Sequence, residues 1–180
     1  MSPFGTRFVA AGLVLAAATA LHAQPFGTEA DTGHADRLWQ AMVEAGLAGD
    51  DAIDTLPYPG TEPHGFVLET FYAEAVVDGH DGALVVKRNY GPEGVGVADV
   101  QGARDDHLDS LTVMFRREDG YDPDNANWFW AKYDPDGTLQ ANPDGRPLAG
   151  RVAKGADQGC IACHANAPGG DYLYTTDAAQ

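Results

Sequence analysis

The stretch "GCIACHANA" at residues 159–167 contains the only two cysteines of the chain, Cys160 and Cys163, followed directly by His164. Two thiols three residues apart on a helical turn match the spacing of the two haem vinyl groups. The next residue can then bring its imidazole to the iron. The sequence therefore predicts one haem c, bound covalently through Cys160 and Cys163, with His164 as the iron ligand.

Three other interpretations of the cysteine pair remain open. A thioredoxin-type redox pair requires a βαβ unit, and strands do not alternate with helices before Cys160. A structural zinc site requires four ligands, so it would have to recruit His64, His80 or His107 from loops. A plain disulfide is the third alternative, because disulfides form readily in exported proteins.

Residues 1–23 have the features of a secretory signal peptide: Arg7, an apolar run from Phe8 to Leu21, and small residues at Ala20 and Ala23. The apolar run is shorter than the roughly 20 residues that a membrane-spanning helix needs. We therefore expect a periplasmic protein that is not embedded in the membrane after cleavage. This location suits covalent haem attachment, which takes place outside the cytoplasmic membrane.

After the signal peptide, residues 24–33 lack periodicity and are expected to form a flexible leader, and residues 34–180 a single domain. The formal net charge of the whole chain is −16, which makes nucleic acid an unfavourable partner. Such a surface serves solubility, or it attracts a basic partner such as an electron-acceptor protein.

The segment "HADRLWQAMVEAGLA" has apolar residues at helical spacing, so it predicts a helix over residues 34–48, capped by Thr32 or Asp31. Short runs rich in β-branched and aromatic residues follow, separated by turn signals, and predict antiparallel strands at residues 66–77, 83–90, 110–117 and 127–133. A short helix then carries the cysteines. The predicted class is α+β, mainly antiparallel sheet.

The sixth position of the iron depends on residues upstream of His164, because the sixteen residues after it contain no Met, His or Lys. The candidates are Met42, Met114, Lys87 and the loop histidines. Methionines in helix and strand patterns more often fill the core than bind metal. The sequence therefore favours a five-coordinate iron held by His164 alone, with a face open to a small molecule.

Three segments together resemble the cytochrome P-460 family and its relative cytochrome c-prime-beta: "HGFVLETFYAEAVVDGHDGALVVKRNYG", "LTVMFRREDGYDPDNANWFWAKYDPDG" and "GCIACHANAPGGDYLYT". The similarity covers about residues 64–176. It implies a β-rich fold, a homodimer and a five-coordinate c-type haem that binds nitric oxide or carbon monoxide, or oxidises hydroxylamine. In the hydroxylamine-oxidising members a strand lysine is bonded to the porphyrin, and Lys87 occupies the matching position.

Lys87 could equally be a strand lysine whose stem covers apolar surface while its amine reaches water. Oxidation of a substrate at the iron also needs a proton acceptor, for which Glu69 and Glu74 are the candidates. Aromatic residues expected to line the haem are Phe66, Phe71, Trp128 and Trp130. The sequence thus leaves three functions: a small-ligand-binding protein, a hydroxylamine-type oxidase, and an electron shuttle with a six-coordinate haem.

Overall fold

The computed structural model describes residues 25–174, so the predicted signal peptide lies outside the described residues. The fold is α+β, as predicted, with an antiparallel sheet in the order β1-β2-β3-β4-β5-β6. Within residues 25–174 no helix is both long enough and apolar enough to span a membrane. The elements are α1 (Glu29–Glu44), β1 (Tyr58–Pro59), β2 (Val67–Val77), β3 (His80–Tyr90), α2 (Val97–Gly102), α3 (Arg104–His107), β4 (Leu108–Arg116), η1 (Pro123–Asn125), β5 (Trp128–Tyr133), β6 (Ala149–Gly150) and α4 (Cys160–His164).

The four predicted strands are confirmed as β2, β3, β4 and β5, each paired with its neighbour in the chain. The turn between β2 and β3 consists of Asp78 and Gly79, whose φ angles are 55° and 78°. Positive φ at both central residues gives a turn whose twist suits a tight hairpin, and Asp-Gly is a favoured pair for it. This turn fixes the register of the two longest strands, in which Val77 faces His80.

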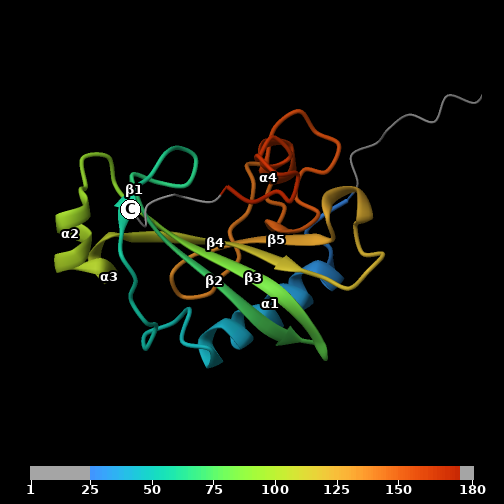
Figure 1. Cartoon of the computed structure of the whole chain (residues 1–180), viewed down its shortest axis with the longest axis horizontal. Coiled ribbons are helices and arrows are strands. Elements are labelled where there is room, and N and C mark those ends of the chain that lie inside the picture. Colours follow the sequence, from blue (N-terminus) through green and yellow to red (C-terminus); the bar gives the residue numbers. More distant parts are fainter. Residues whose placement is uncertain (1–24, 175–180) are drawn as a thin grey trace, which may run out of the picture.

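Helix α1 packs across one face of the sheet, below and behind it in the view of Figure 1. Its apolar side chains Leu38 and Met42 are fully buried against Phe115 and Phe129 of the sheet. Leu111, Val113 and Phe115 of β4 all belong to this core, as their alternation predicts.

The start of α1 differs from the prediction. The helix begins at Glu29, so residues 29–33 belong to it and not to a leader over residues 24–33. Its cap is Thr28, which forms a capping box with Asp31: each side chain accepts a hydrogen bond from the other residue's backbone N–H. Thr32 and Asp31, the predicted caps, lie inside the helix. The capping box satisfies two backbone donors at the first turn.

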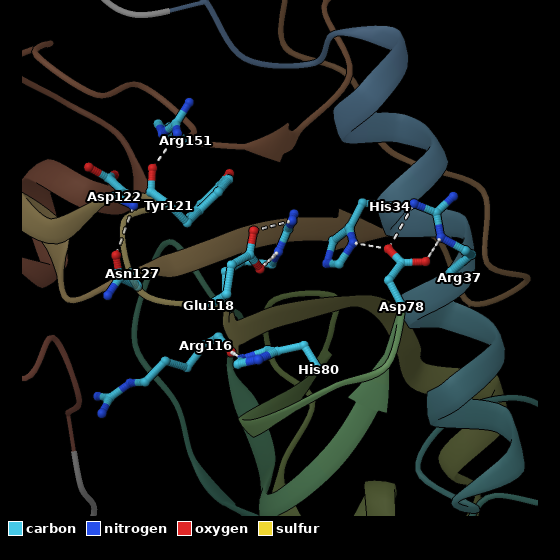
Figure 2. Close-up of polar contacts among 11 residues, drawn as sticks. His34, Arg37, Asp78, His80, Arg116, Glu118, Tyr121, Asp122, Asn127 and Arg151 are labelled. Atoms are coloured by element: carbon cyan, nitrogen blue, oxygen red, sulfur yellow. Dashed lines mark hydrogen bonds and ion pairs between the residues drawn. The ribbon is translucent and has the colours of Figure 1, made fainter.

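A polar cluster joins α1 to the β2–β3 hairpin (Figure 2). Asp78 accepts hydrogen bonds from Arg37 and lies 3.0 Å from His34 Nδ1. Burial of His34 lowers the pKa of its imidazole, although the hydrogen bond to Asp78 acts in the opposite direction. At the start of β3, His80 Nε2 lies 3.1 Å from the carbonyl oxygen of Arg116, the last residue of β4.

A second apolar core lies on the opposite face of the sheet. It joins Val85, Met114, Trp128 and Trp130 of the sheet to Ile161 of α4. Figure 1 shows α4 above the sheet on this side, with α2 and α3 near one end of the sheet. Both faces of the sheet are therefore covered over part of their area.

Candidate haem-binding site

The two cysteines lie on α4, which begins directly after Gly159. Gly159 has a φ of 120°, and a Cβ at this position would lie 2.5 Å from the Cβ of Ala153, so only glycine fits here. Cys160 and Cys163 are both free thiols one helical turn apart. Burial raises the pKa of the Cys160 thiol to about 11. Cys160 therefore lacks the thiolate character of a redox-active cysteine.

His164 is buried and is held by the chain that follows it. Its Nδ1 lies 2.7 Å from the carbonyl oxygen of Tyr172, which can only accept, so Nδ1 carries the hydrogen and Nε2 is left with a lone pair. Burial is the largest cause of a lowered pKa at His164, and the charge of Lys87 lowers it further. A neutral imidazole with Nε2 free is the form that binds iron.

Residues 171–174, which we call the proximal strap, are themselves anchored to the fold. Trp128 Nε1 donates to the carbonyl oxygen of Asp171 at 2.9 Å. The Tyr172 hydroxyl lies 3.0 Å from both the carbonyl oxygen of Asp124 and Oδ1 of Asn125. Tyr172 has a φ of 68°, a conformation that a bulky residue adopts only when its surroundings impose it. The strap thus sets the orientation of the His164 ring.

Two adjoining cavities of about 270 and 540 Å³ open beside His164. Both are lined by His64, Lys87, Cys163, His164 and Tyr174, so the imidazole and one thiol face a common space. The smaller cavity lies over the sheet, and its walls are mostly apolar. Its lining also includes Pro63, Thr70, Tyr72, Val85, Thr112, Val113, Met114, Trp130, Ala131, Lys132, Gly159, Cys160 and Leu173.

His64 contacts the same space from the loop before β2, and its ring centroid lies 5.9 Å from that of His164. A chain of polar groups fixes it: His64 Nδ1 lies 3.1 Å from Thr112 Oγ1, and Asn89 Nδ2 reaches both Thr112 Oγ1 and Ser110 Oγ. Burial, followed by the charge of Lys87, lowers the pKa of His64 to about 3. His64 is therefore neutral at physiological pH.

Lys87 also faces the cavities, from the middle of β3. It belongs to a row of cross-strand neighbours, Thr70, Lys87, Thr112 and Lys132, which crosses four strands on this face of the sheet. Burial lowers the pKa of the Lys87 amine. Among the described residues, neither Lys87 nor Lys132 forms an ion pair with a carboxylate. Lys132 was not singled out from the sequence. Alternation along β5 places it on the same face as Trp130, which was predicted to line the haem, so this signal could have found it.

The structure separates the other candidate ligands. Met114 lines the smaller cavity, whereas Met42 is fully buried between α1 and the sheet. His80 and His107 do not line either cavity. These positions leave His64, Lys87 and Met114 as the upstream candidates near His164.

Three of the four aromatic residues predicted to line the haem lie elsewhere. Only Trp130 faces the smaller cavity, with its ring centroid 4.8 Å from that of His164. Phe71 points to the α1 face, where Arg88 lies over its ring. Trp128 is fully buried behind the proximal strap, and Phe66 is partly exposed outside both cavities. An aromatic run in a strand cannot show which face holds a cofactor.

Neither carboxylate proposed as a proton acceptor lines a cavity. Glu69 is fully buried on the α1 side of the sheet, where it accepts hydrogen bonds from Tyr90 (2.6 Å), Arg104 (2.9 Å) and Arg88 (3.4 Å). Glu74 is exposed. Among the described residues, Glu62 is the one acidic residue that lines the larger cavity, and none lines the smaller one.

These residues fit a haem better than the alternatives. His164 offers a free Nε2, two free thiols precede it at the spacing of a Cys-x-x-Cys-His motif, and the adjoining space is mostly apolar. The sheet is antiparallel, so the described residues before the cysteines contain no βαβ unit. Within residues 25–174 no group of three or more His, Cys, Asp or Glu side chains could hold a metal ion such as zinc. The fold and site together define a haem-binding protein with a C-terminal Cys-x-x-Cys-His motif.

Comparison with protein families agrees with this description. The family model described as Cytochrome P460 matches residues 59–175, so the chain belongs to the cytochrome P460 family. Membership in this family of c-type haem proteins implies a haem cofactor with its iron. Comparison with curated proteins and with solved structures finds no match.

Proposed function

We propose that this chain is an exported mono-haem cytochrome that binds small ligands, such as nitric oxide, at an iron held by His164. The observation that carries the proposal is the shared cavity wall, where His164 and Cys163 face the same mostly apolar space. The haem supplies a metal centre that binds diatomic and nitrogenous molecules. The protein supplies the attachment, the axial imidazole and the walls that decide which molecules enter.

Attachment uses the two thiols of α4. Each S–H adds across one vinyl group: sulfur bonds to one vinyl carbon, the hydrogen goes to the other, and the carbon–carbon double bond becomes single. Cys160 and Cys163 are free to react in this way. The proximal strap holds Nδ1–H of His164, so that Nε2 is oriented for the iron.

A second candidate function, oxidation of hydroxylamine-like nitrogen compounds, is favoured by the position of Lys87. Lys87 lines both cavities, as a bond to the porphyrin would require. The absence of a carboxylate from the described lining of the smaller cavity supports ligand binding instead, because substrate oxidation needs a proton acceptor near the iron. We therefore place ligand binding first. The six-coordinate electron shuttle remains the third possibility.

The site of action that we propose is the periplasm, on the basis of the signal peptide predicted at residues 1–23. Redox partners would be basic electron-acceptor proteins, because a formal net charge of −16 attracts positively charged surfaces. A homodimer is proposed from the family resemblance.

The test begins with the full chain expressed in a host that attaches haem to exported proteins. We expect one covalent haem by intact mass, loss of covalent haem in the Cys160→Ala/Cys163→Ala double variant, and a shifted spectrum of the ferrous protein on adding nitric oxide. Hydroxylamine with an electron acceptor then separates the first two functions, because turnover would favour the oxidase. A protein that leaves the periplasm as bare polypeptide would refute the proposal.

A further inference from the structure

The partners of the lysines and arginines single out two cations in the site. All of these residues except Arg7 lie within the described part of the chain. Five of them form ion pairs with carboxylates: Arg37, Arg88, Arg104, Arg117 and Lys154. Three more lie over aromatic rings: Arg116, Arg146 and Arg151. The remaining two are Lys87 and Lys132, and both line the smaller cavity.

The surroundings of these two lysines contrast with the acidic character of the chain. The formal net charge is −16, yet among the described residues no carboxylate lines the smaller cavity. Burial lowers the pKa of the Lys87 amine, as expected for a cation that is partly removed from water. Positive charges beside a mostly apolar space are costly unless an anion compensates them. The cavity therefore suits an occupant that carries negative charge.

The other polar groups in the row Thr70, Lys87, Thr112 and Lys132 already have partners. Thr70 Oγ1 lies 2.6 Å from the hydroxyl of Tyr58. Thr112 Oγ1 is engaged by His64 and Asn89. Within the described part of the chain, the two amines are thus the groups of this row that remain available to an anion.

The spacing of the lysines fits an occupant with two negative groups. Lys87 and Lys132 are both cross-strand neighbours of Thr112, so one strand separates them. Neighbouring strands lie about 4.8 Å apart, which places the two Cα atoms roughly 10 Å from each other. Haem carries two carboxylates on short flexible arms at one edge of its ring, and the long lysine side chains can adapt to them. The number of charges and their grouping therefore match.

Of the two lysines, Lys132 gives the cleaner assignment. Lys87 is also the residue that would bond to the porphyrin in a hydroxylamine-oxidising protein, and such a bond would change its charge. Lys132 has no second role of this kind, and it lies on β5 two residues after Trp130, which contacts His164.

We propose that Lys132 binds a carboxylate of the haem and thereby raises the reduction potential of the iron. Lys87 supplies the second positive charge of the row. A cation near the iron disfavours the ferric state, which carries one more positive charge than the ferrous state. The proposal rests on the haem attachment described under the proposed function.

The experiment compares the haem-loaded wild type with Lys132→Gln, Lys132→Arg and the control Arg146→Gln. The control removes one positive charge from an exposed residue outside both cavities. Spectroelectrochemistry should show a lower reduction potential in Lys132→Gln than in the wild type, no change in Arg146→Gln, and recovery in Lys132→Arg, which can also bind a carboxylate. The carboxylate bending band of the haem in resonance Raman spectra should shift in Lys132→Gln alone. Lys132→Thr, which favours a strand, serves as the neutral variant if Lys132→Gln does not fold.

An anion from solution is the competing occupant, and added nitrite or phosphate tests it. If either anion changed the spectrum or potential of the wild type but not of Lys132→Gln, the lysines would hold a free anion and the proposal would be wrong. An unshifted carboxylate band in the neutral variants, or an unchanged potential, would also overturn it. Intact mass reports haem attachment separately in every variant. A wild type without covalent haem would refute the proposed function, whereas the other outcomes leave attachment intact.

Discussion

The substitution Glu69→Gln separates a structural role from a catalytic one. In the structure, the Glu69 carboxylate is fully buried and binds Arg104 Nε at 2.9 Å, Arg88 Nη1 at 3.4 Å and the hydroxyl of Tyr90 at 2.6 Å. Glutamine removes the charge but keeps one oxygen that can accept from Tyr90 or Arg104. Arg88, whose side chain is 6% exposed, loses its closest carboxylate partner.

Removing one partner of a buried ion pair typically costs about 3–5 kcal/mol. We expect the lower end, about 3 kcal/mol, because Arg104 also lies 3.2 Å from Asp54 and its side chain is 22% exposed, so it remains partly compensated. For a chain of this length, this loss corresponds to a melting temperature lower by roughly 6–12 °C. Ligand binding by the folded protein should not change, because Glu69 lies on the sheet face opposite the cavities.

Thermal and urea denaturation followed by circular dichroism measure the loss of stability, and nitric oxide titration with hydroxylamine turnover measures function. Glu74→Gln is the matched control on the same strand, since Glu74 is exposed and should change neither quantity. If Glu69→Gln kept its stability within about 1 kcal/mol but lost turnover or ligand binding, Glu69 would act at the iron and our placement of the buried network would be wrong.

Three other predictions test the parts of the fold that support the site. Thr28→Ala removes the capping box of α1 and should lower the free energy of unfolding by about 1 kcal/mol in urea titrations, with the haem spectrum unchanged. Gly65→Ala places a Cβ 2.9 Å from the carbonyl oxygen of Tyr90 on a backbone with positive φ. This substitution should displace the loop that carries His64 and alter the haem absorption spectrum at neutral pH. The control Gly79→Ala should leave the spectrum unchanged, because its Cβ meets no atom within 4 Å. Burial lowers the pKa of His34 below its ordinary value of 6.5, so the unfolded chain binds more protons than the folded one as the pH falls below about 6.5, and the free energy of unfolding should decrease there. His34→Gln should flatten this part of the pH profile of the unfolding free energy. An unchanged slope would contradict the lowered pKa of His34.

The strands could be predicted from the sequence because their signals are local. Alternation in residues 110–117 and the Asp78-Gly79 turn determine both strand identity and hairpin register. The start of α1 was harder to predict from the sequence, because Thr28, Asp31 and Thr32 can each cap a helix and only the folded chain shows which of them does. Helices α2 and α3 were missed, since they are short and follow a glycine-rich turn signal.

The residues of the candidate site also differ in how well the sequence predicts them. Cys160, Cys163 and His164, which we propose attach the haem, form one local motif, so their spacing alone predicts the chemistry. His64 comes from a loop about one hundred residues earlier in the chain, and its distance to His164 exists only after the sheet has formed. Glu69 shows the limit clearly: a carboxylate in a strand is equally compatible with a cofactor pocket or a buried ion pair until the partners on each face are known.

Neighbouring residues on the central strands serve different purposes, because alternate side chains point to opposite faces of a sheet. Lys87 faces the cavities while the adjacent Arg88 is buried with Glu69 on the α1 side. In the same way Thr112 holds His64, whereas Val113 packs in the core under α1. The main buried core thus lies on one face of the sheet and the proposed ligand chemistry on the other. Lys87 and Thr112 line the smaller cavity but belong to neither buried core, so they can change by substitution without loss of the core. We therefore expect differences in ligand preference among chains of this fold to map to these polar positions.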